Sequence, residues 1–239
     1  MSTNKVKSVV VALPDGTIRQ FHHRGSSADV GVVGQVFDQR DYSLHRLKRR
    51  DEFQAKFHDL LGSGRKPFVV DAGANIGASV VWFATVFPGS HIVAFEPDPE
   101  NYELLRANTA GLDVDLRKAA VGSVDGKVSV LDPGEGEWGY RTVLDPTGSC
   151  NLVSMSRLFG EKLAAGYTPF LVKIDIEGGE EDLFRESTEW VSETPILIIE
   201  LHDWLLPSKG TSGNFLKSIA GYDRDFIPVG ENIFSLKNS

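Results

Sequence analysis

The sequence predicts an α/β fold, in which a mostly parallel sheet is covered by helices on both faces and preceded by a short N-terminal extension. From residue 67 onward, short apolar runs alternate with segments of helical character, and these runs lie at residues 68–70, 92–95, 171–174 and 196–199. Strands that are apolar throughout are typical of parallel sheets buried on both faces. A chain of 239 residues accommodates one such domain with a full hydrophobic core.

The residues before the sheet are expected to form a hairpin followed by a helical segment. Two β-like runs, at residues 6–13 and 17–21, flank a Pro-Asp-Gly turn sequence. The chain is then more polar, with an apolar stripe at helical spacing formed by Phe53, Phe57, Leu60 and Leu61. We therefore predict an N-terminal hairpin and helical cap over residues 1–64 and a main domain over residues 65–239.

Turn-forming residues divide the second half of the main domain. Strands are expected at residues 127–131 and 140–144, on either side of a Gly-rich loop at residues 132–139 that we interpret as an insertion over the site. Runs at residues 225–229 and 232–236 flank a Gly-Glu turn. They predict an antiparallel hairpin that finishes the sheet.

The composition is that of an ordinary globular protein and narrows the function classes. A formal net charge of −8 argues against a partner held by phosphate neutralisation, so no nucleic-acid partner is expected. The single cysteine, Cys150, cannot form an internal disulfide, which favours a reducing compartment. The N-terminal residues lack the apolar centre of a signal peptide, and no apolar run reaches membrane-spanning length. We expect a cytoplasmic protein without a membrane partner.

The first strand-turn-helix segment of the main domain carries a nucleotide-binding pattern. A buried strand leads into a turn with Gly73 and Gly77, whose backbones permit a tight reversal before the next helix. Glu96 ends the following strand, at the separation from which an acidic side chain reaches ribose hydroxyls. Ligands of open α/β sheets bind at the carboxyl ends of the strands, where these residues fall. The pattern predicts an adenosine-containing ligand.

The residues of this turn favour one adenosine ligand over another. Gly73, Asn75 and Ala78 overlay the dinucleotide fingerprint imperfectly, because asparagine stands where glycine must let a pyrophosphate approach. The carboxylate of Asp71 would repel a pyrophosphate but suits a ligand that carries an ammonium and a sulfonium. We therefore predict S-adenosylmethionine. In the competing structural interpretation, the glycines only close a turn and Asp71 caps a helix.

The rest of the cofactor site is expected around this turn. The third strand is expected near residues 114–120, and the small residues 119–122 beside its end offer a wall for an adenine, although alanines there more often pack than recognise a ligand. The residues predicted to bind the cofactor are Asp71, Gly73, Ala74, Asn75, Gly77, Glu96, Pro97, Ala120 and Asp175.

Charged residues at the ends of two later strands indicate a reaction centre. Lys173 and Asp175 lie on one side of an apolar strand, because of its period of two, and are expected to form an ion pair. Glu200 and His202 share a face at the end of the next strand. Methyl transfer to a hydroxyl requires removal of a proton, and a histidine near its unperturbed pKa suits that role. We predict all four as catalytic, with His202 or Asp175 as general base.

The same side chains have other interpretations. Asp175, Glu200 and His202 could bind a divalent metal that lowers the pKa of the acceptor hydroxyl, but these residue types do not define an ion, and no metal is predicted. His202 could instead only hydrogen-bond the end of the sheet. Structural ion pairs also produce charged clusters of this kind.

Four segments of the chain resemble FkbM-type methyltransferases in their order and spacing, at residues 68–77, 93–97, 119–122 and 172–178. The Lys-Ile-Asp-Ile-Glu-Gly sequence that begins at Lys173 is the most family-specific part. The resemblance covers residues 67–202. It implies a class I methyltransferase with a seven-stranded Rossmann-like sheet, which methylates hydroxyls of sugars, polyketide natural products or related glycoconjugates.

The resemblance also implies roles for individual residues. Glu96 matches the ribose ligand, Asp175 falls at the strand end that faces the transferred methyl group, and the cofactor loop contains Asp71, Gly73, Asn75 and Gly77. The first 60 residues and the loop at residues 134–140 match nothing in the family, so we expect the choice of acceptor to depend on them.

The leading hypothesis is an S-adenosylmethionine-dependent O-methyltransferase that acts on a small-molecule or glycan hydroxyl, as a monomer or a homo-oligomer. An NAD-linked oxidoreductase is the alternative from another reaction class. A non-catalytic nucleoside-binding module is the third hypothesis, because a fold does not imply a chemistry.

Overall fold

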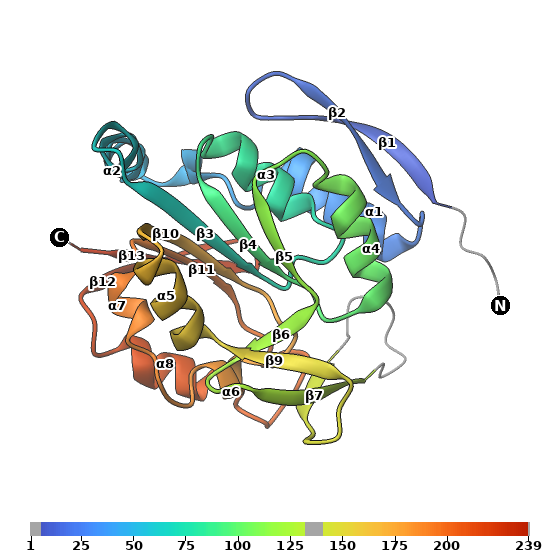
Figure 1. The fold of residues 1–239 in the computed structure, drawn as a ribbon, viewed down its shortest axis with the longest axis vertical. Coiled ribbons are helices and arrows are strands. Elements are labelled where there is room, and N and C mark those ends of the chain that lie inside the picture. Colours follow the sequence, from blue (N-terminus) through green and yellow to red (C-terminus); the bar gives the residue numbers. More distant parts are fainter. Residues whose placement is uncertain (1–5, 132–140, 239) are drawn as a thin grey trace.

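A seven-stranded sheet runs through the centre of the structure (Figure 1). The computed structural model describes residues 6–131 and 141–238. Within them, the strands in their order across this sheet are β12 (Arg224–Val229), β13 (Asn232–Lys237), β11 (Ile196–Glu200), β10 (Tyr167–Ile174), β3 (Lys66–Ala72), β4 (His91–Phe95) and β5 (Val114–Arg117). β13 is antiparallel to β11 and β12, and the other neighbours are parallel. The predicted mostly parallel sheet with a C-terminal antiparallel hairpin is confirmed.

The centre of the sheet is the place where the strand order reverses. β3 is followed outward by β4 and β5, and the chain then returns to place β10 on the other side of β3. The last residues of β3 and β10, Ala72 and Ile174, lie side by side, and Ile174 pairs with Ile199 of β11. The loops that follow these three strands therefore meet at one edge, where open α/β sheets bind their ligands.

Helices cover both faces of the sheet (Figure 1). Side chains of alternate strand residues belong to two separate apolar clusters, as expected for a sheet buried on both sides. One face packs against α2 (Arg50–Gly62), α3 (Ala78–Val86) and α4 (Pro99–Asn108). The other packs against α5 (Met155–Ala164), α6 (Glu180–Leu183), α7 (Trp190–Glu193) and α8 (Gly213–Ile219).

A second, four-stranded sheet lies beside the main one, in the order β6 (Ala119–Gly122), β9 (Cys150–Ser154), β7 (Gly126–Leu131) and β8 (Arg141–Leu144). The sequence predicted one strand up to Ala120, whereas the structure interrupts it at Lys118, because residues 119–122 pair with β9 and leave the main sheet. β7 and β8 confirm the two strands predicted there. The Gly-rich loop between them lies outside the described residues.

The N-terminal residues pack onto the α3 side of the sheet. β1 (Lys7–Ala12) and β2 (Ile18–His23) form the predicted hairpin, and α1 (Ser27–Val33), a π-helical turn η1 (Gly34–Gln39) and a 3₁₀ turn η2 (Leu44–Arg46) lead to α2. Phe21, Phe37 and Phe53 are buried in the same apolar cluster as the strand residue Val69. No helix among the described residues is long and apolar enough to span a membrane.

A buried arginine fixes this segment to α4. The guanidinium of Arg24 donates two hydrogen bonds to Asp29, at 2.7 and 3.1 Å, and one of 2.7 Å to the side chain of Asn101 in α4. Both charged side chains are almost fully buried. Asn108, at the end of α4, adds hydrogen bonds to both backbone groups of His22. The start of α1 is therefore held at a fixed place above the sheet edge.

Replacing Asp29 by alanine is expected to lower the free energy of unfolding by about 3–5 kcal/mol, because the buried Arg24 guanidinium would lose its buried carboxylate partner. Urea unfolding measures this change. Asp51→Ala is the matched control, since Asp51 is exposed and, within the part of the chain that the structure describes, its one ion pair is with the exposed Arg50. It should shift stability by no more than about 0.5 kcal/mol. Equal effects of the two substitutions would contradict the assigned role of Asp29.

Candidate functional site

Two adjoining cavities open at the carboxyl ends of β3, β4, β10 and β11. The narrow cavity lies between β4 and the chain after β10, and its walls include Phe95, Pro97, Ala119, Ala120 and Val121. The wide cavity has a volume of about 490 Å³. Four residues line both cavities, namely Gly73, Asn75, Asp175 and Glu177. The two cavities therefore meet at the turn after β3 and the turn after β10.

The turn after β3 is shaped by left-handed backbone conformations. Gly73 has φ of 83°, and a Cβ atom there would lie 1.7 Å from the carbonyl oxygen of Asp175, so only glycine fits. Asn75 has φ of 48° and Gly77, which caps α3, has φ of 93°. The amides of Gly73 and Ala74 both donate to the carbonyl of Phe95, at 3.1 and 2.8 Å. The turn is thereby held against the end of β4.

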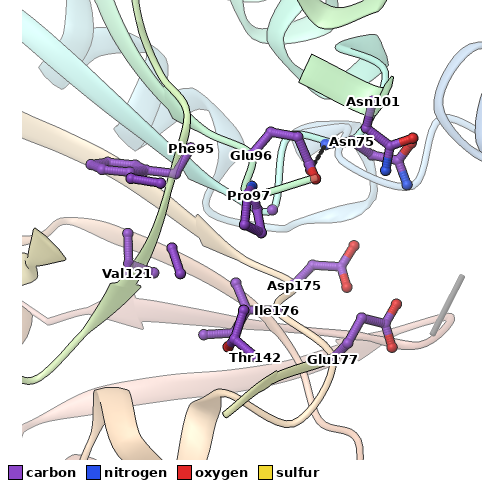
Figure 2. A pocket seen from close by; sticks show the side chains of 13 residues that line it. Asn75, Phe95, Glu96, Pro97, Asn101, Val121, Thr142, Asp175, Ile176 and Glu177 are labelled. Carbon is purple, nitrogen blue, oxygen red and sulfur yellow. Dashed lines mark hydrogen bonds between the residues drawn. The ribbon is translucent and has the colours of Figure 1, made fainter. Parts of the chain in front are cut away.

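The carboxylate of Glu96 is prepared to accept further hydrogen bonds. One oxygen accepts from the amide of Asn75 at 2.8 Å (Figure 2). The other accepts from the amide of Asp98 at 2.9 Å, which leaves a lone pair on each oxygen. Burial raises the pKa of Glu96 to about 7 and outweighs the two amide hydrogen bonds, which lower it, while the charge of Asp98 adds to the rise. A buried carboxylate with two open acceptor positions suits a ligand with a pair of hydroxyls, as a ribose has.

Lys173 contacts both turns, the one after β3 and the one after β10. Its ammonium donates to the carbonyl of Gly73 at 2.6 Å and lies 3.2 Å from Asp71 and 3.5 Å from Asp175, which confirms the expected pair with Asp175. Burial by itself lowers the pKa of Lys173, but the carboxylates of Asp71 and Asp175 raise it above its ordinary value. The ammonium therefore stays charged at all physiological pH values.

The structure corrects the place expected for Asp71. This carboxylate is fully buried, lines neither cavity, and is compensated by Lys173 and by a hydrogen bond from the hydroxyl of Ser79. Its charge acts on Lys173 and not directly on a ligand. Asp71 was expected to face the positive groups of a cofactor, whereas the structure pairs its buried carboxylate with Lys173.

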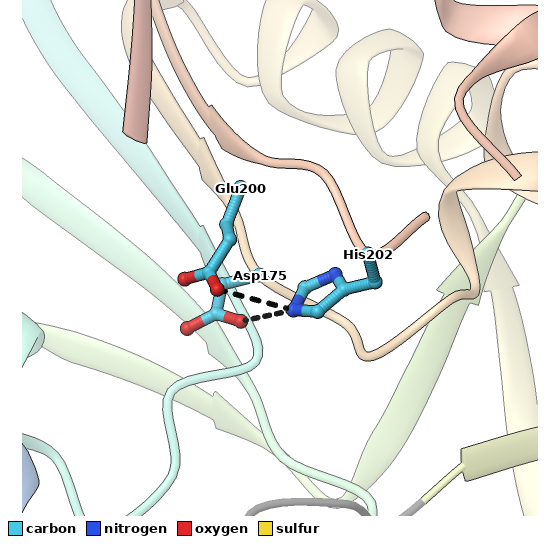
Figure 3. A group of neighbouring side chains, drawn as sticks. All are labelled: Asp175, Glu200 and His202. Atoms are coloured by element: carbon cyan, nitrogen blue, oxygen red, sulfur yellow. Dashed lines mark ion pairs between the residues drawn. The ribbon is translucent and has the colours of Figure 1, made fainter. Parts of the chain in front are cut away.

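His202 is buried and is surrounded by four carboxylates, of which Figure 3 shows Asp175 and Glu200. Its Nδ1 atom lies 2.9 Å from Glu180, and its Nε2 atom lies 3.4 Å from Glu177 and 3.6 Å from both Asp175 and Glu200. Burial lowers the pKa of His202, but the hydrogen bond to Glu180 and the surrounding carboxylates raise it to about 9. The imidazole is therefore protonated at neutral pH.

The positive charge of His202 differs from the expectation from the sequence, which was a histidine near its unperturbed pKa. An unperturbed pKa suited His202 as general base, whereas an imidazolium that is 1% exposed and lines neither cavity has no free nitrogen to take a proton. The expectation overlooked Glu177 and Glu180, which supply part of the negative charge around the ring.

The same geometry tests the metal alternative. Asp175, Glu200 and His202 each offer one ligand atom, and these atoms lie within 4.8 Å of one another. These side chains are of types that bind divalent metals. The Nε2 atom of the His202 imidazolium, however, carries a proton and faces the carboxylates of Asp175 and Glu200. Lys173 is a second positive neighbour of Asp175. The arrangement fits an imidazolium shared among carboxylates, and no step below depends on a metal.

The walls of the wide cavity come from several distant parts of the chain. Lys173, Asp175, Glu177 and Glu200 supply charged groups at the strand ends. Apolar and aromatic residues face them from the N-terminal segment and from the chain after β11, namely Val32, Val36, Tyr42, Trp204 and Leu205. Burial raises the pKa of Glu200 to about 7, and the charge of Asp175 adds to this rise.

Most of the predicted site residues converge, but not all. Glu96, Pro97 and Ala120 line the narrow cavity; Ala74, Lys173 and Glu200 line the wide one; Gly73, Asn75 and Asp175 line both. Asp71, Gly77 and His202 line neither. Sequence reasoning missed Glu177, Tyr42 and Trp204. Only Glu177 had a signal, because it follows Lys173 and Asp175 at intervals of two.

Comparison with known proteins agrees with a methyltransferase. The family described as "Methyltransferase FkbM domain" matches residues 71–223, which is more than half of the chain. Methyltransferase sdnD of Sordaria araneosa is 38% identical over 73 residues, covering 29% of this chain and 28% of that relative, so the match spans little more than a quarter of the relative's length.

Solved structures with a related arrangement are more distant in sequence. An O-methyltransferase from Bacillus cereus in complex with SAH has 14% identity and a TM-score of 0.43, covering 87% of this chain and 90% of that chain. A putative O-methyltransferase from Klebsiella pneumoniae has 14% identity and a TM-score of 0.44, covering 90% and 91% of the two chains.

The fold and the family together define an S-adenosylmethionine-dependent methyltransferase. The chain belongs to the FkbM methyltransferase family. The family match covers the turn after β3, the end of β4 and the charged segment after β10, and it decides against the NAD-linked oxidoreductase.

The affinity for S-adenosylhomocysteine is expected to rise about tenfold between pH 6 and pH 8. Glu96 has a pKa of about 7, so it becomes charged over this range, and a charged carboxylate accepts stronger hydrogen bonds from ribose hydroxyls. Calorimetric titration at both pH values measures the change. Glu96→Gln should bind more weakly and lose this pH dependence. A glutamine variant that keeps the full dependence would refute the assignment.

The raised pKa of His202 predicts a loss of stability at alkaline pH. Its ordinary value is about 6.5 and its folded value is about 9, so its contribution is complete below pH 6.5 and is lost as the pH rises through 9. The difference corresponds to about 3 kcal/mol. Urea unfolding should show a steeper decline for the wild type than for His202→Gln between these pH values. Parallel profiles would show that His202 is not held as an imidazolium.

Proposed function

We propose that this chain transfers the methyl group of S-adenosylmethionine to a hydroxyl oxygen of a sugar, a glycoconjugate or a polyketide-type natural product. The junction of the two cavities carries this proposal. Asp175 and Glu177 are shared by both cavities, and Glu200 stands beside them. A hydroxyl becomes a good nucleophile when it loses its proton, so carboxylates at this junction suit an oxygen acceptor.

The narrow cavity suits the cofactor. Glu96 would hold the ribose hydroxyls with its two free lone pairs, and the adenine would lie between apolar walls that include Phe95, Pro97 and Ala120. The methionine part would then extend along the turn of Gly73 and Asn75 toward the junction. This placement brings the methyl group to the boundary of the wide cavity, next to Asp175.

Lys173 and His202 act through other residues in this proposal. The ammonium of Lys173 fixes the carbonyl of Gly73 and the carboxylate of Asp175, and the imidazolium of His202 fixes the carboxylates around it. Methyl transfer is an in-line displacement that depends on the positions of oxygen, carbon and sulfur. Both cations therefore act as positioning residues in this proposal, because the contacts of Lys173 are to the turn and to Asp175, and His202 lines neither cavity.

The wide cavity suits a small polar acceptor with apolar parts. Its volume of about 490 Å³ lies within the range of sites for small molecules. Carboxylates on one side accept hydrogen bonds from hydroxyls, and Val32, Val36 and Trp204 on the other side offer apolar contact. Sugars and hydroxylated natural products carry both kinds of surface.

A screen of hydroxylated acceptors tests the proposed function. The purified chain is incubated with methyl-labelled S-adenosylmethionine and a panel of sugars and hydroxylated polyketide fragments, each paired with its deoxy and amino analogues, and products are identified by mass spectrometry. We expect label in an O-methyl group for a hydroxylated compound and none for its deoxy analogue. Label found only on nitrogen or carbon would overturn the oxygen assignment. Glu96→Gln serves as the cofactor-binding control.

A further inference from the structure

We propose that Glu177 is the general base, whose carboxylate takes the proton of the acceptor hydroxyl as the oxygen receives the methyl group. This inference rests on the proposed function and deepens it. The residue was not among those that the sequence indicated as catalytic.

The position of Glu177 is at the boundary that the methyl group must cross. Among the described residues, only Asp175 and Glu177 place carboxylates on both cavities. Figure 2 shows both side chains on the same side of the narrow cavity, opposite Glu96. A base must lie within hydrogen-bond reach of the acceptor while the acceptor touches the methyl group. The junction is the location that meets both conditions.

The backbone at Glu177 is held in an uncommon conformation. Its φ is 52°, in the left-handed region that favours glycine, and Asn75 across the junction has φ of 48°. Glycine occupies the next two positions, 178 and 179. The first left-handed residue of this turn is nevertheless a glutamate and not a glycine. Residues kept in such conformations cluster at functional sites. The side chain therefore has a role that offsets this backbone cost.

The other charged groups near the junction are less suited to take the proton. Asp175 is already engaged by the ammonium of Lys173, which lies 3.5 Å away. Glu200 lines only the wide cavity. His202 is a buried imidazolium. Glu177 lies 3.4 Å from this imidazolium, but among the described residues it is the carboxylate that reaches both cavities and forms no ion pair with a lysine.

The charges that face Glu177 come from three elements. Burial raises its pKa, the carboxylates of Asp175, Glu200 and Glu180 raise it further, and the imidazolium of His202 lowers it, with a result of about 8. Without a cofactor, much of this carboxyl is protonated at neutral pH. A sulfonium in the narrow cavity favours the charged form. The free carboxylate is therefore formed when the methyl donor is bound and not when the demethylated product is bound.

The proposed step balances in atoms and charge. The O–H bond of the acceptor breaks and its proton passes to a carboxylate oxygen of Glu177. The acceptor oxygen forms a bond to the methyl carbon, and the carbon–sulfur bond breaks with its electron pair left on sulfur. The sulfonium becomes a neutral thioether, and Glu177 then holds the proton until the product leaves. No oxidant, reductant or further reactant is needed.

A proton-linkage measurement tests this proposal without knowledge of the acceptor. S-adenosylmethionine and S-adenosylhomocysteine are titrated calorimetrically at pH 7 in buffers of different ionisation enthalpy, which gives the protons released on binding. The two ligands differ by the methyl group and its positive charge, so contributions from Glu96 cancel. We expect the methyl donor to release several tenths of a proton more than the product in the wild type.

Variants assign this difference to a residue. Glu177→Gln should abolish most of it, Glu177→Asp should retain it, and the matched control Glu181→Gln, which removes an exposed carboxylate four residues away, should leave it unchanged. Glu177→Gly suits the left-handed backbone, so it removes the carboxylate even if the glutamine variant folds poorly. The proposal is overturned if Glu177→Gln keeps the difference, or if Glu200→Gln alone removes it.

Kinetics with an acceptor from the screen provide the second test. Glu177→Gln should lower kcat by about 10²- to 10⁴-fold, with cofactor affinity nearly unchanged, as expected for loss of a general base. Wild-type turnover by this variant would refute the proposal. Failure of the proposed role of Glu177 can be distinguished from failure of the proposed function. The linkage measurement needs no acceptor, whereas the assignment of an oxygen acceptor depends only on the atom that carries the label.

Discussion

The ammonium of Lys173 joins the parts of the structure on which the site depends. β3 and β10 are adjacent where the strand order reverses, and each ends in a turn with left-handed residues. One buried charge contacts the carbonyl of Gly73 in the first turn and Asp175 in the second, with Asp71 as its counter-ion beneath. A buried charge is stable only with such partners. The Lys173 side chain therefore fixes the positions of the two turns at which the cavities meet.

A second buried cation organises the outer part of the same edge. His202 comes from the chain after β11 and contacts carboxylates from the turn after β10, from α6 and from the end of β11. Two of these carboxyl groups, Glu177 and Glu200, have pKa values raised to about 8 and 7, chiefly because of burial. A general base acts most efficiently when its pKa lies near the working pH.

The sequence was sufficient to predict the sheet and the cofactor turn, because these depend on local patterns. Apolar strands, the glycines at 73 and 77 and the acidic end of β4 each follow from properties of a few neighbouring residues. The break between β5 and β6 was not predictable in this way, since it depends on pairing with β9, more than 30 residues later. Long-range pairing is absent from any local pattern.

The errors in the site have a related physical cause. Asp71 and His202 stand at strand ends, as the pattern indicated, but their burial and partners decide their roles. The pKa of His202 is set by Glu180, which lies on another element, and the charge of Asp71 is compensated by Lys173 from the neighbouring strand. Tyr42 reaches the wide cavity from the N-terminal segment, for which no motif exists. The sequence pattern was sufficient to place Asp71 and His202 at strand ends. Their charge partners could not be predicted, because those partners come from other parts of the chain.

The N-terminal wall of the wide cavity has a consequence for classification. The family match begins at residue 71, whereas Val32, Val36 and Tyr42 precede it and line the wide cavity. Under the proposed function, the matched region would carry methyl donation, and the N-terminal segment would carry part of the selectivity. Two members that are alike throughout the matched region would then be able to act on different compounds. Grouping such enzymes by substrate requires comparison of the residues that the family definition leaves out.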